Sequence, residues 1–345
     1  MLKNRSIKKI KTMQQLLTDI RQIIAEARRQ VQRNVNITMV QSYWLVGKRI
    51  IEEEQEGKSR AKYATDALTH ISIELTKEFG QGFSVTNLKQ MRRFYTTYPI
   101  RQMPSDELGI FPNPRISWSN YLLLMRIKDP AERRFYELEA AENMWSLEEL
   151  KRQFNAALYQ RLALSRDKEA VKKLSQEGWR IESPADAIKD PYILEFLGLE
   201  ERPSYSEEDL EEAIIDQLEQ FLLELGKGYA FVARQKRITF DEKHFHIDLV
   251  FYNRLLRAFV LIDLKIGELE HRDLGQMQMY VNYYDREIKL PDENRTIGIV
   301  LCRDKSDMVV EYTLPEGNTQ IFASQYDLVL PSKEEFITVL KTIKK

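Results

Sequence analysis

One stretch, from Phe245 to Lys265, constrains the fold of this chain more than any other part of its sequence. It consists of two apolar runs joined by the five residues NRLLR, and each run places alternate side chains on one side of a strand. A connection this short makes the two runs an antiparallel hairpin. Asp248 lies in the first run, and Asp263 and Lys265 lie in the second, so the hairpin can bring three charged side chains together.

Charged side chains inside an apolar sheet are costly unless they are paired or bind a metal ion. Carboxylate oxygens are the ligands that Mg²⁺ prefers in proteins. A lone Asp-x-Lys on a strand is more often a surface ion pair. The hairpin therefore predicts a magnesium site only if the rest of the chain supports one.

Length and composition limit what the hairpin can belong to. At 345 residues, the chain is long enough for two domains. The formal net charge of −1 conceals a basic beginning, because the first sixty residues hold 13 Lys and Arg against 6 Asp and Glu, a balance suited to phosphate. The single cysteine, Cys302, argues against a disulfide-built secreted protein, and the four histidines show no zinc-ligand spacing. No apolar run approaches the ~20 residues that cross a bilayer, so we expect a cytoplasmic protein with no membrane partner.

The N-terminal domain, residues 1–165, is predicted to be all helical. Apolar residues recur at three- and four-residue steps between residues 13 and 54, and further capped helices follow a loop near residues 100–114. Tyr43 and Trp44 could stack on a nucleic-acid base. Aromatic residues in an amphipathic helix are more often core, however, and we expect these two to be buried.

A helix-turn-helix is the clearest local pattern in this domain. Gly80 and Gly82 break a helix, and Ser84 is a good N-cap for a second helix that ends near Tyr95. The second helix would show three basic side chains on one exposed side: Lys89, Arg92 and Arg93. The alternative is an ordinary pair of helices with a solvated basic face.

The second domain, residues 192–345, follows a charged, proline-containing stretch at residues 166–191 that we interpret as a linker. It opens with a helix that ends at Gly226, followed by three strands, a helix over residues 271–287 and further apolar strands. This order predicts an α/β sandwich with a mixed sheet. The predicted fold class is therefore α + α/β.

HIDLVFY followed by VLIDLK resembles the two-part signature of the PD-(D/E)xK nuclease superfamily, and the order of elements resembles its restriction-endonuclease-like core. Ile247 stands where the signature has proline. Phrases from both halves of the chain are similar to the YhcG-type family, a bacterial family with a helical N-terminal domain and a PD-(D/E)xK domain: YWLVGKRI, ELTKEFGQGFSVTNLKQMRRFY, MWSLEELKRQ, FLLELGKGYAFVARQKRI and GQMQMYVNYYD.

The resemblance implies a role for each residue of the hairpin. Asp248 and Asp263 would bind Mg²⁺ or Mn²⁺ together with the carbonyl of Leu264, and Lys265 would orient the attacking water or help to deprotonate it.

The resemblance also implies a third acidic ligand on the preceding helix. Glu211 is the best match and Glu212 is the alternative. Gln235 and Gln276 could contact phosphate or a metal-bound water, and structural hydrogen bonds explain them equally well.

The predicted function is that of a metal-dependent nuclease acting on DNA. Two alternatives remain at this stage: an RNA-cleaving nuclease, and a non-catalytic DNA- or partner-binding protein that keeps the nuclease fold. We also expect a homodimer or larger assembly held by the N-terminal helices, because one such centre cuts one strand. The competing interpretation is a closed, monomeric helical bundle.

Overall fold

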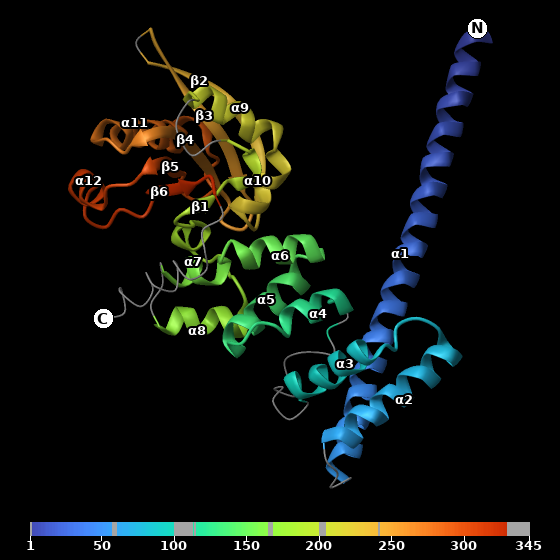
Figure 1. Cartoon of the computed structure of the whole chain (residues 1–345). Helices are drawn as coiled ribbons and strands as arrows, with labels where there is room; N and C mark the ends of the chain where they lie inside the picture. Colours follow the sequence, from blue (N-terminus) through green and yellow to red (C-terminus); the bar gives the residue numbers. More distant parts are fainter. Residues whose placement is uncertain are drawn as a thin grey trace. The chain divides into compact units, whose positions relative to one another are not determined.

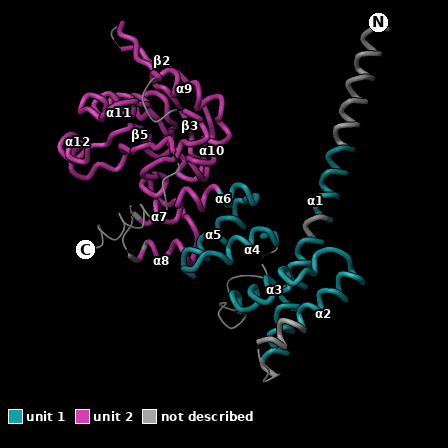
Figure 2. Tube along the Cα trace, viewed as in Figure 1, with its two compact units in different colours: residues 1–151 teal, residues 152–345 magenta. Residues whose placement is uncertain are grey.

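The computed structural model describes residues 2–56, 61–99, 113, 115–164, 168–199, 205–240 and 242–329. The chain divides into two compact units, residues 1–151 and residues 152–345 (Figure 2). None of the helices in the described ranges combines the length and the apolar character needed to cross a membrane.

The first unit is built from helices, as predicted. They are α1 (Leu2–Glu56), α2 (Ala61–Phe79), α3 (Val85–Thr97), α4 (Trp118–Leu124), α5 (Pro130–Glu142) and the beginning of α6 (Leu147–Asn155). Ser84 caps α3 as expected, since its hydroxyl accepts a hydrogen bond from the backbone N–H of Asn87 at 3.3 Å.

Close packing of α1 against α3 organises this unit. A side chain at Gly47 would lie 2.0 Å from the carbonyl oxygen of Met91, so only glycine permits the two helices to approach this closely. Trp44 is buried, as predicted, and its indole N–H donates to the carbonyl of Tyr98 at 3.0 Å. Tyr43 is half-buried, with its ring centroid 4.9 Å from that of Trp118.

The second unit is built around a six-stranded sheet (Figure 1). Its strands are β1 (Tyr192–Ile193), β2 (Tyr229–Phe240), β3 (Lys243–Asn253), β4 (Ala258–Glu268), β5 (Ile297–Asp304) and β6 (Ile321–Asp327), in the order β1-β6-β5-β4-β3-β2. Its helices are the end of α6, then α7 (Leu158–Leu164), α8 (Lys168–Glu177), α9 (Glu207–Asp216), α10 (Leu218–Leu225), α11 (His271–Tyr283) and α12 (Asp307–Thr313).

The sheet is mixed, as the order of elements predicted. Strands β2, β3 and β4 are antiparallel, while β5 runs parallel to both β4 and β6, and β6 runs parallel to β1. Two apolar clusters cover the sheet. One includes Ile214 of α9 and Phe221 of α10, and the other includes Met277 and Val281 of α11. The sandwich architecture is therefore confirmed.

The helix predicted to end at Gly226 does end there, but it is broken at Gln217 into α9 and α10. Gly226 has a φ of 105°, and a side chain on it would lie 2.3 Å from the ring of Trp179. Trp179 belongs to residues 166–191, the predicted linker. The described part of that stretch lies in the second unit, where Trp179, Ala187 and Lys189 are buried.

A buried ion network ties α6 and α7 to α10. The Arg161 guanidinium donates to the Glu224 carboxylate at 2.7 Å, and both side chains are fully buried. Arg152 Nη2 lies 3.3 Å and Lys189 Nζ 3.8 Å from the same carboxylate. Burial alone would raise the pKa of Glu224, but the three cations outweigh it and hold the pKa at about 2.

Candidate active site

Asp248 lies on β3, next to the position where β3 pairs with β4. The registered pair Leu249 and Ile262 places Asp248 opposite Asp263 one step further along the two antiparallel strands. Asp248 Oδ2 accepts a hydrogen bond from the backbone N–H of Leu264 at 2.8 Å, and its Oδ1 accepts one from the Gln235 amide at 3.1 Å. Both bonds hold the carboxylate against the neighbouring strands.

Asp263, on β4, is the buried carboxylate of this group, with 2% of its surface exposed. Lys265 Nζ lies 2.9 Å from Asp263 Oδ2, but no donor among the described residues approaches that oxygen in hydrogen-bond direction. Burial raises the pKa of Asp263 to about 7, and the nearby Asp248 carboxylate acts in the same direction against the opposing effect of Lys265.

The Lys265 ammonium has three oxygen neighbours. It donates to the carbonyl of Leu264 at 3.1 Å and lies 2.9 Å from Asp263 and 3.4 Å from Glu207 Oε2. Burial lowers the pKa of Lys265, but these carboxylates outweigh it and raise the pKa above its usual range. Lys265 therefore stays protonated at neutral pH and acts as a donor.

Glu211, on α9, reaches the same site from the helical side. The Gln235 amide donates to its carboxylate, and Arg234 Nε lies 3.5 Å from its other oxygen. The pKa of Glu211 is raised, mainly by burial. The negative charge of Asp248 acts in the same direction, and the hydrogen bond from Gln235 acts against it. Glu212, the alternative, is exposed.

Gln235 is the link between the helix and the sheet, because its amide donates to both Glu211 and Asp248. It has a left-handed backbone, with a φ of 46°. Gln276, on α11, donates to the hydroxyl of Tyr280, and that hydroxyl donates to the carbonyl of His246 at 2.9 Å. Gln276 thus supports the strand from the side of α11.

Glu207 is a neighbour of Lys265 that the sequence interpretation missed. It occupies the first turn of α9, four residues before Glu211. Residues four apart lie on one face of a helix, so this spacing was a signal that could have found it.

The oxygen atoms at this site suit a Mg²⁺ ion that keeps several water ligands better than an ion enclosed by protein side chains. Within the described residues, no three His, Cys, Asp or Glu side chains are arranged to enclose a metal ion, and the Gln235 amide stands between Glu211 and Asp248. Mg²⁺ commonly binds one or two carboxylates and completes its shell with water and substrate oxygens. Asp248, Asp263 and the carbonyl of Leu264 provide such a set, and Asp263 Oδ2 is a buried oxygen whose near neighbour is the Lys265 ammonium, 2.9 Å away and out of hydrogen-bond direction.

The basic residues predicted to contact DNA lie on α3 of the first unit. Arg92 pairs with Glu54 at 2.8 Å, and Arg93 donates to the carbonyl of Met125 at 2.7 Å. Lys89 is exposed, and all three residues line one hollow with Glu54 and its neighbours. Two of the three cations therefore already have partners.

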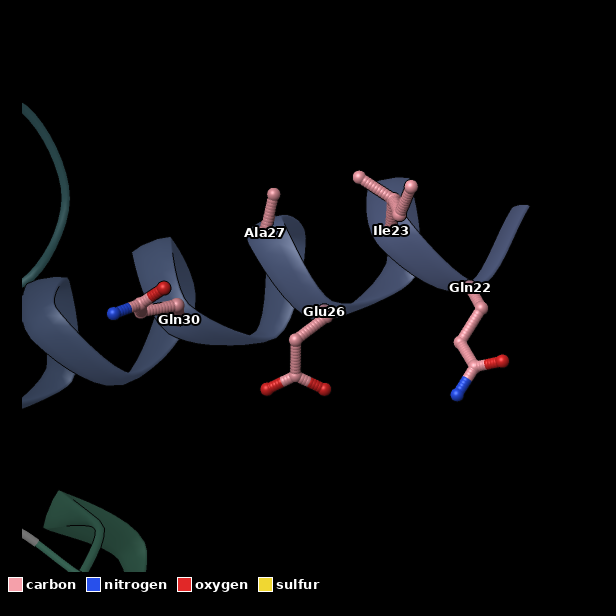
Figure 3. Close-up of a pocket in the computed structure, with 5 residues that line it drawn as sticks. All are labelled: Gln22, Ile23, Glu26, Ala27 and Gln30. Atoms are coloured by element: carbon pink, nitrogen blue, oxygen red, sulfur yellow. The ribbon is translucent and has the colours of Figure 1, made fainter. Parts of the chain in front are cut away.

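A second shallow hollow lies on α1 and is lined by five side chains (Figure 3): Gln22, Ile23, Glu26, Ala27 and Gln30. It contains no acidic pair and none of the predicted site residues.

Comparison with known proteins identifies relatives for both parts of the chain. Residues 185–341 match the family described as "YhcG PDDEXK nuclease domain", and residues 19–161 match the "DUF1016 N-terminal domain". The chain is 38% identical over 348 residues to the Escherichia coli (strain K12) protein named "Putative nuclease YhcG", covering 93% of this chain and 92% of that protein.

Two solved structures are similar to a smaller part of this chain and at lower sequence identity. A repair endonuclease from Pyrococcus abyssi is 17% identical, with a TM-score of 0.26, over 38% of this chain and 50% of its own. The structure of an EndoMS–dsDNA complex is also 17% identical, with a TM-score of 0.26, over 35% of this chain and 46% of its own.

Proposed function

The chain belongs to the YhcG family, whose C-terminal part is a PDDEXK nuclease domain, and on that premise we propose that it is a metal-dependent nuclease that hydrolyses phosphodiester bonds in DNA. One observation carries the proposal. The buried Asp263 carboxylate, with a pKa raised to about 7, lies beside Asp248 and 2.9 Å from the ammonium of Lys265. Such a concentration of charge costs folding free energy, which a catalytic role would explain.

Asp248, Asp263 and the carbonyl of Leu264 would hold Mg²⁺ or Mn²⁺. When bound, the metal would offset negative charge on the scissile phosphate and on the leaving oxygen. Lys265 is a protonated donor in this arrangement, so its proposed role is to orient the attacking water. Deprotonation of that water by Lys265 would first require the ammonium to lose its proton.

Glu211 is the proposed third acidic residue. It is buried and linked to Asp248 through Gln235, whereas Glu212 is exposed. A matched pair of variants separates the two: Glu211→Gln should reduce cleavage strongly, and Glu212→Gln should leave it near wild type. Equal activity of the two variants would contradict the assignment of Glu211.

Incubation with labelled single-stranded DNA, duplex DNA, branched DNA and RNA tests the proposed activity. We expect cleavage of DNA with Mg²⁺ and none with a chelator. The Asp263→Asn variant should be inactive under all conditions. Cleavage of RNA alone would favour the RNA nuclease, while binding without cleavage of any substrate would favour a non-catalytic role.

We propose that the two predicted domains have different roles. Residues 192–345 carry the chemistry, and the helical residues 1–165 recruit DNA or a second copy of the chain. Contact of α3 with DNA would use Lys89 directly, because Arg92 and Arg93 must first leave Glu54 and the carbonyl of Met125. Action on chromosomal DNA would place the protein in the cytoplasm.

A homodimer or larger assembly through α1 is the proposed quaternary structure. Ile20, Ile24, Ala27 and Val31 follow each other by four, three and four residues, the spacing of a helical seam, and the three larger side chains are 43% to 63% exposed. Figure 3 shows Ile23 and Ala27 projecting to one side of α1. A second copy of α1 would cover such a seam and bring two nuclease centres to one duplex.

A further inference from the structure

The hairpin of β2 and β3 extends beyond the part of the sheet that β4 completes (Figure 1). β3 pairs with β4 from Leu249 to Asn253, whereas β2 and β3 pair with each other as far as Phe240 and Lys243. Residues 236–240 and 243–247 therefore form a two-stranded ribbon that begins next to Gln235 and Asp248. A two-stranded ribbon of this kind fits the major groove of DNA.

One face of the ribbon is apolar and packed. Ile238 and Ile247 are buried in the cluster that contains residues of α11, and Phe240 and Phe245 pack against that cluster. The ring of Phe240 lies 5.4 Å from the ring of Tyr283. The ribbon is therefore anchored to α11, which fixes its direction relative to the proposed active site.

The opposite face is polar and exposed. Alternation along the strands places Arg237 opposite His246 and Thr239 opposite His244 on this face, and all four residues are exposed. Gln235 and Asp248 begin the same row, since Gln235 points to Glu211 on α9 and away from α11. The row thus continues outward from the proposed metal ligands.

The arginine on this face, Arg237, is not paired with a carboxylate among the described residues. Arg237 Nη2 lies 2.8 Å from Nε2 of the His244 ring. Some exposed arginines elsewhere in the unit do pair with acids, as Arg257 does with Asp292 at 2.5 Å and Arg272 with Glu270 at 2.9 Å. The two ribbon strands, residues 236–240 and 243–247, contain three Lys and Arg and no Asp or Glu, and of the three basic residues Arg237 lies on this face.

We propose that the exposed face of this ribbon, formed by Arg237, Thr239, His244 and His246, is a second DNA-binding surface that holds backbone phosphates beyond the scissile bond. The proposal rests on the proposed nuclease function and adds how the substrate is held. His244 is four residues from Asp248, a span of about 13 Å at ~3.3 Å per residue. A DNA strand rises ~3.4 Å per nucleotide along the duplex axis, so a ribbon aligned with that axis would reach phosphates as far as about four nucleotides from the cut.

Binding of a labelled duplex to the full-length protein without divalent metal tests this surface. The variant R237Q/H244Q removes the Arg237 guanidinium and the His244 ring and leaves the apolar face intact. We expect the Kd to rise by about tenfold and the slope of log Kd against log salt to fall by about 1. Cleavage at saturating DNA should stay near wild type. The control is R254Q, an exposed arginine in the turn at the other end of β3.

Photo-crosslinking gives an independent measurement. A crosslinker attached to T239C should react with bound DNA, whereas one attached to R254C should not. Cys302 is buried and its pKa is raised to about 12 by that burial, so it should stay unlabelled. Wild-type affinity and salt slope in R237Q/H244Q, or no crosslink from T239C, would overturn the proposal while DNA binding and cleavage by the wild type stand. Failure of the wild type to bind DNA would instead remove the proposed function and this surface together.

Discussion

Replacing Arg161 with Met tests whether the buried ion network holds the second unit together. The change removes a guanidinium 2.7 Å from Glu224 and keeps an unbranched apolar side chain in its place. Against the effect of burial, the network lowers the pKa of Glu224 from 4.5 to about 2, which corresponds to about 3 kcal/mol at ~1.4 kcal/mol per pKa unit. Removing one partner of a buried pair typically costs ~3–5 kcal/mol. We expect Arg161→Met to lower the free energy of unfolding by about 3 kcal/mol.

Urea unfolding and thermal melting measure this loss. A destabilisation of about 3 kcal/mol should lower the Tm of the second unit by roughly 6–12 °C, given its size. The exposed arginine variant Arg254→Met should change the Tm little. The depressed pKa of Glu224 stabilises the fold above pH ~4.5, and that contribution disappears as the pH falls through about 2. The difference between variant and wild type should therefore shrink in acid.

An unchanged unfolding midpoint in Arg161→Met at pH 7 would refute this reasoning, as would a difference that does not shrink in acid. The same network predicts the behaviour of fragments. A fragment that begins at residue 185, where the match to the nuclease family begins, lacks Arg152 and Arg161, so that Lys189 is the one cation of this network left beside Glu224. A fragment that begins at Ser146 keeps α6 and α7, and we expect only this longer fragment to unfold cooperatively.

Three further predictions concern the site and the first unit. Asp263→Asn should abolish cleavage and should have a higher Tm than the wild type above pH 7. Protonated Asp263 stabilises the fold at low pH, and this stabilisation is lost from the wild type as the pH rises through about 7. A difference in Tm between variant and wild type that is the same at pH 5 and at pH 8 would contradict the raised pKa. Neutralising Lys89, Arg92 and Arg93 together should reduce the salt dependence of DNA binding, and a wild-type slope would assign α3 to assembly instead. Light scattering should show a dimer for the wild type and a monomer for Ile24→Asp, and a monomeric wild type would exclude the α1 seam.

The hairpin at the site could be predicted because every signal for it is local. Alternation and a short turn fix the pairing of β3 with β4, and that pairing alone places Asp248 opposite Asp263. The position of Glu211 followed from the family resemblance, and its burial was not visible in the sequence. Solvated helix acids such as Glu212 have the same local pattern.

The ion network could not be predicted, because it depends on contacts between distant parts of the chain. Arg161 and Glu224 are 63 residues apart. In the sequence, Arg161 is the single charged residue of α7, and Glu224 shares α10 with the exposed Glu219, so neither residue shows a partner locally. The same limit explains residues 166–191, where charge and prolines suggested a linker. Trp179 and Lys189 are buried there because Trp179 packs on Gly226 and Lys189 lies beside Glu224.

Gln235 shows why the chemistry of the site depends on more than its strand pattern. Its left-handed backbone, with a φ of 46°, interrupts β2 next to Asp248 and directs the amide to Glu211. An amide can donate to two carboxylates at once, so it lowers the repulsion that two acids in direct contact would feel. Gln235 therefore keeps Glu211 and Asp248 close without a metal ion, and a proposed ion that bound both acids would have to displace that amide. Gln235→Ala should consequently let the Glu211 and Asp248 carboxylates move apart, and this effect should be larger in the metal-free protein than in the metal-bound protein.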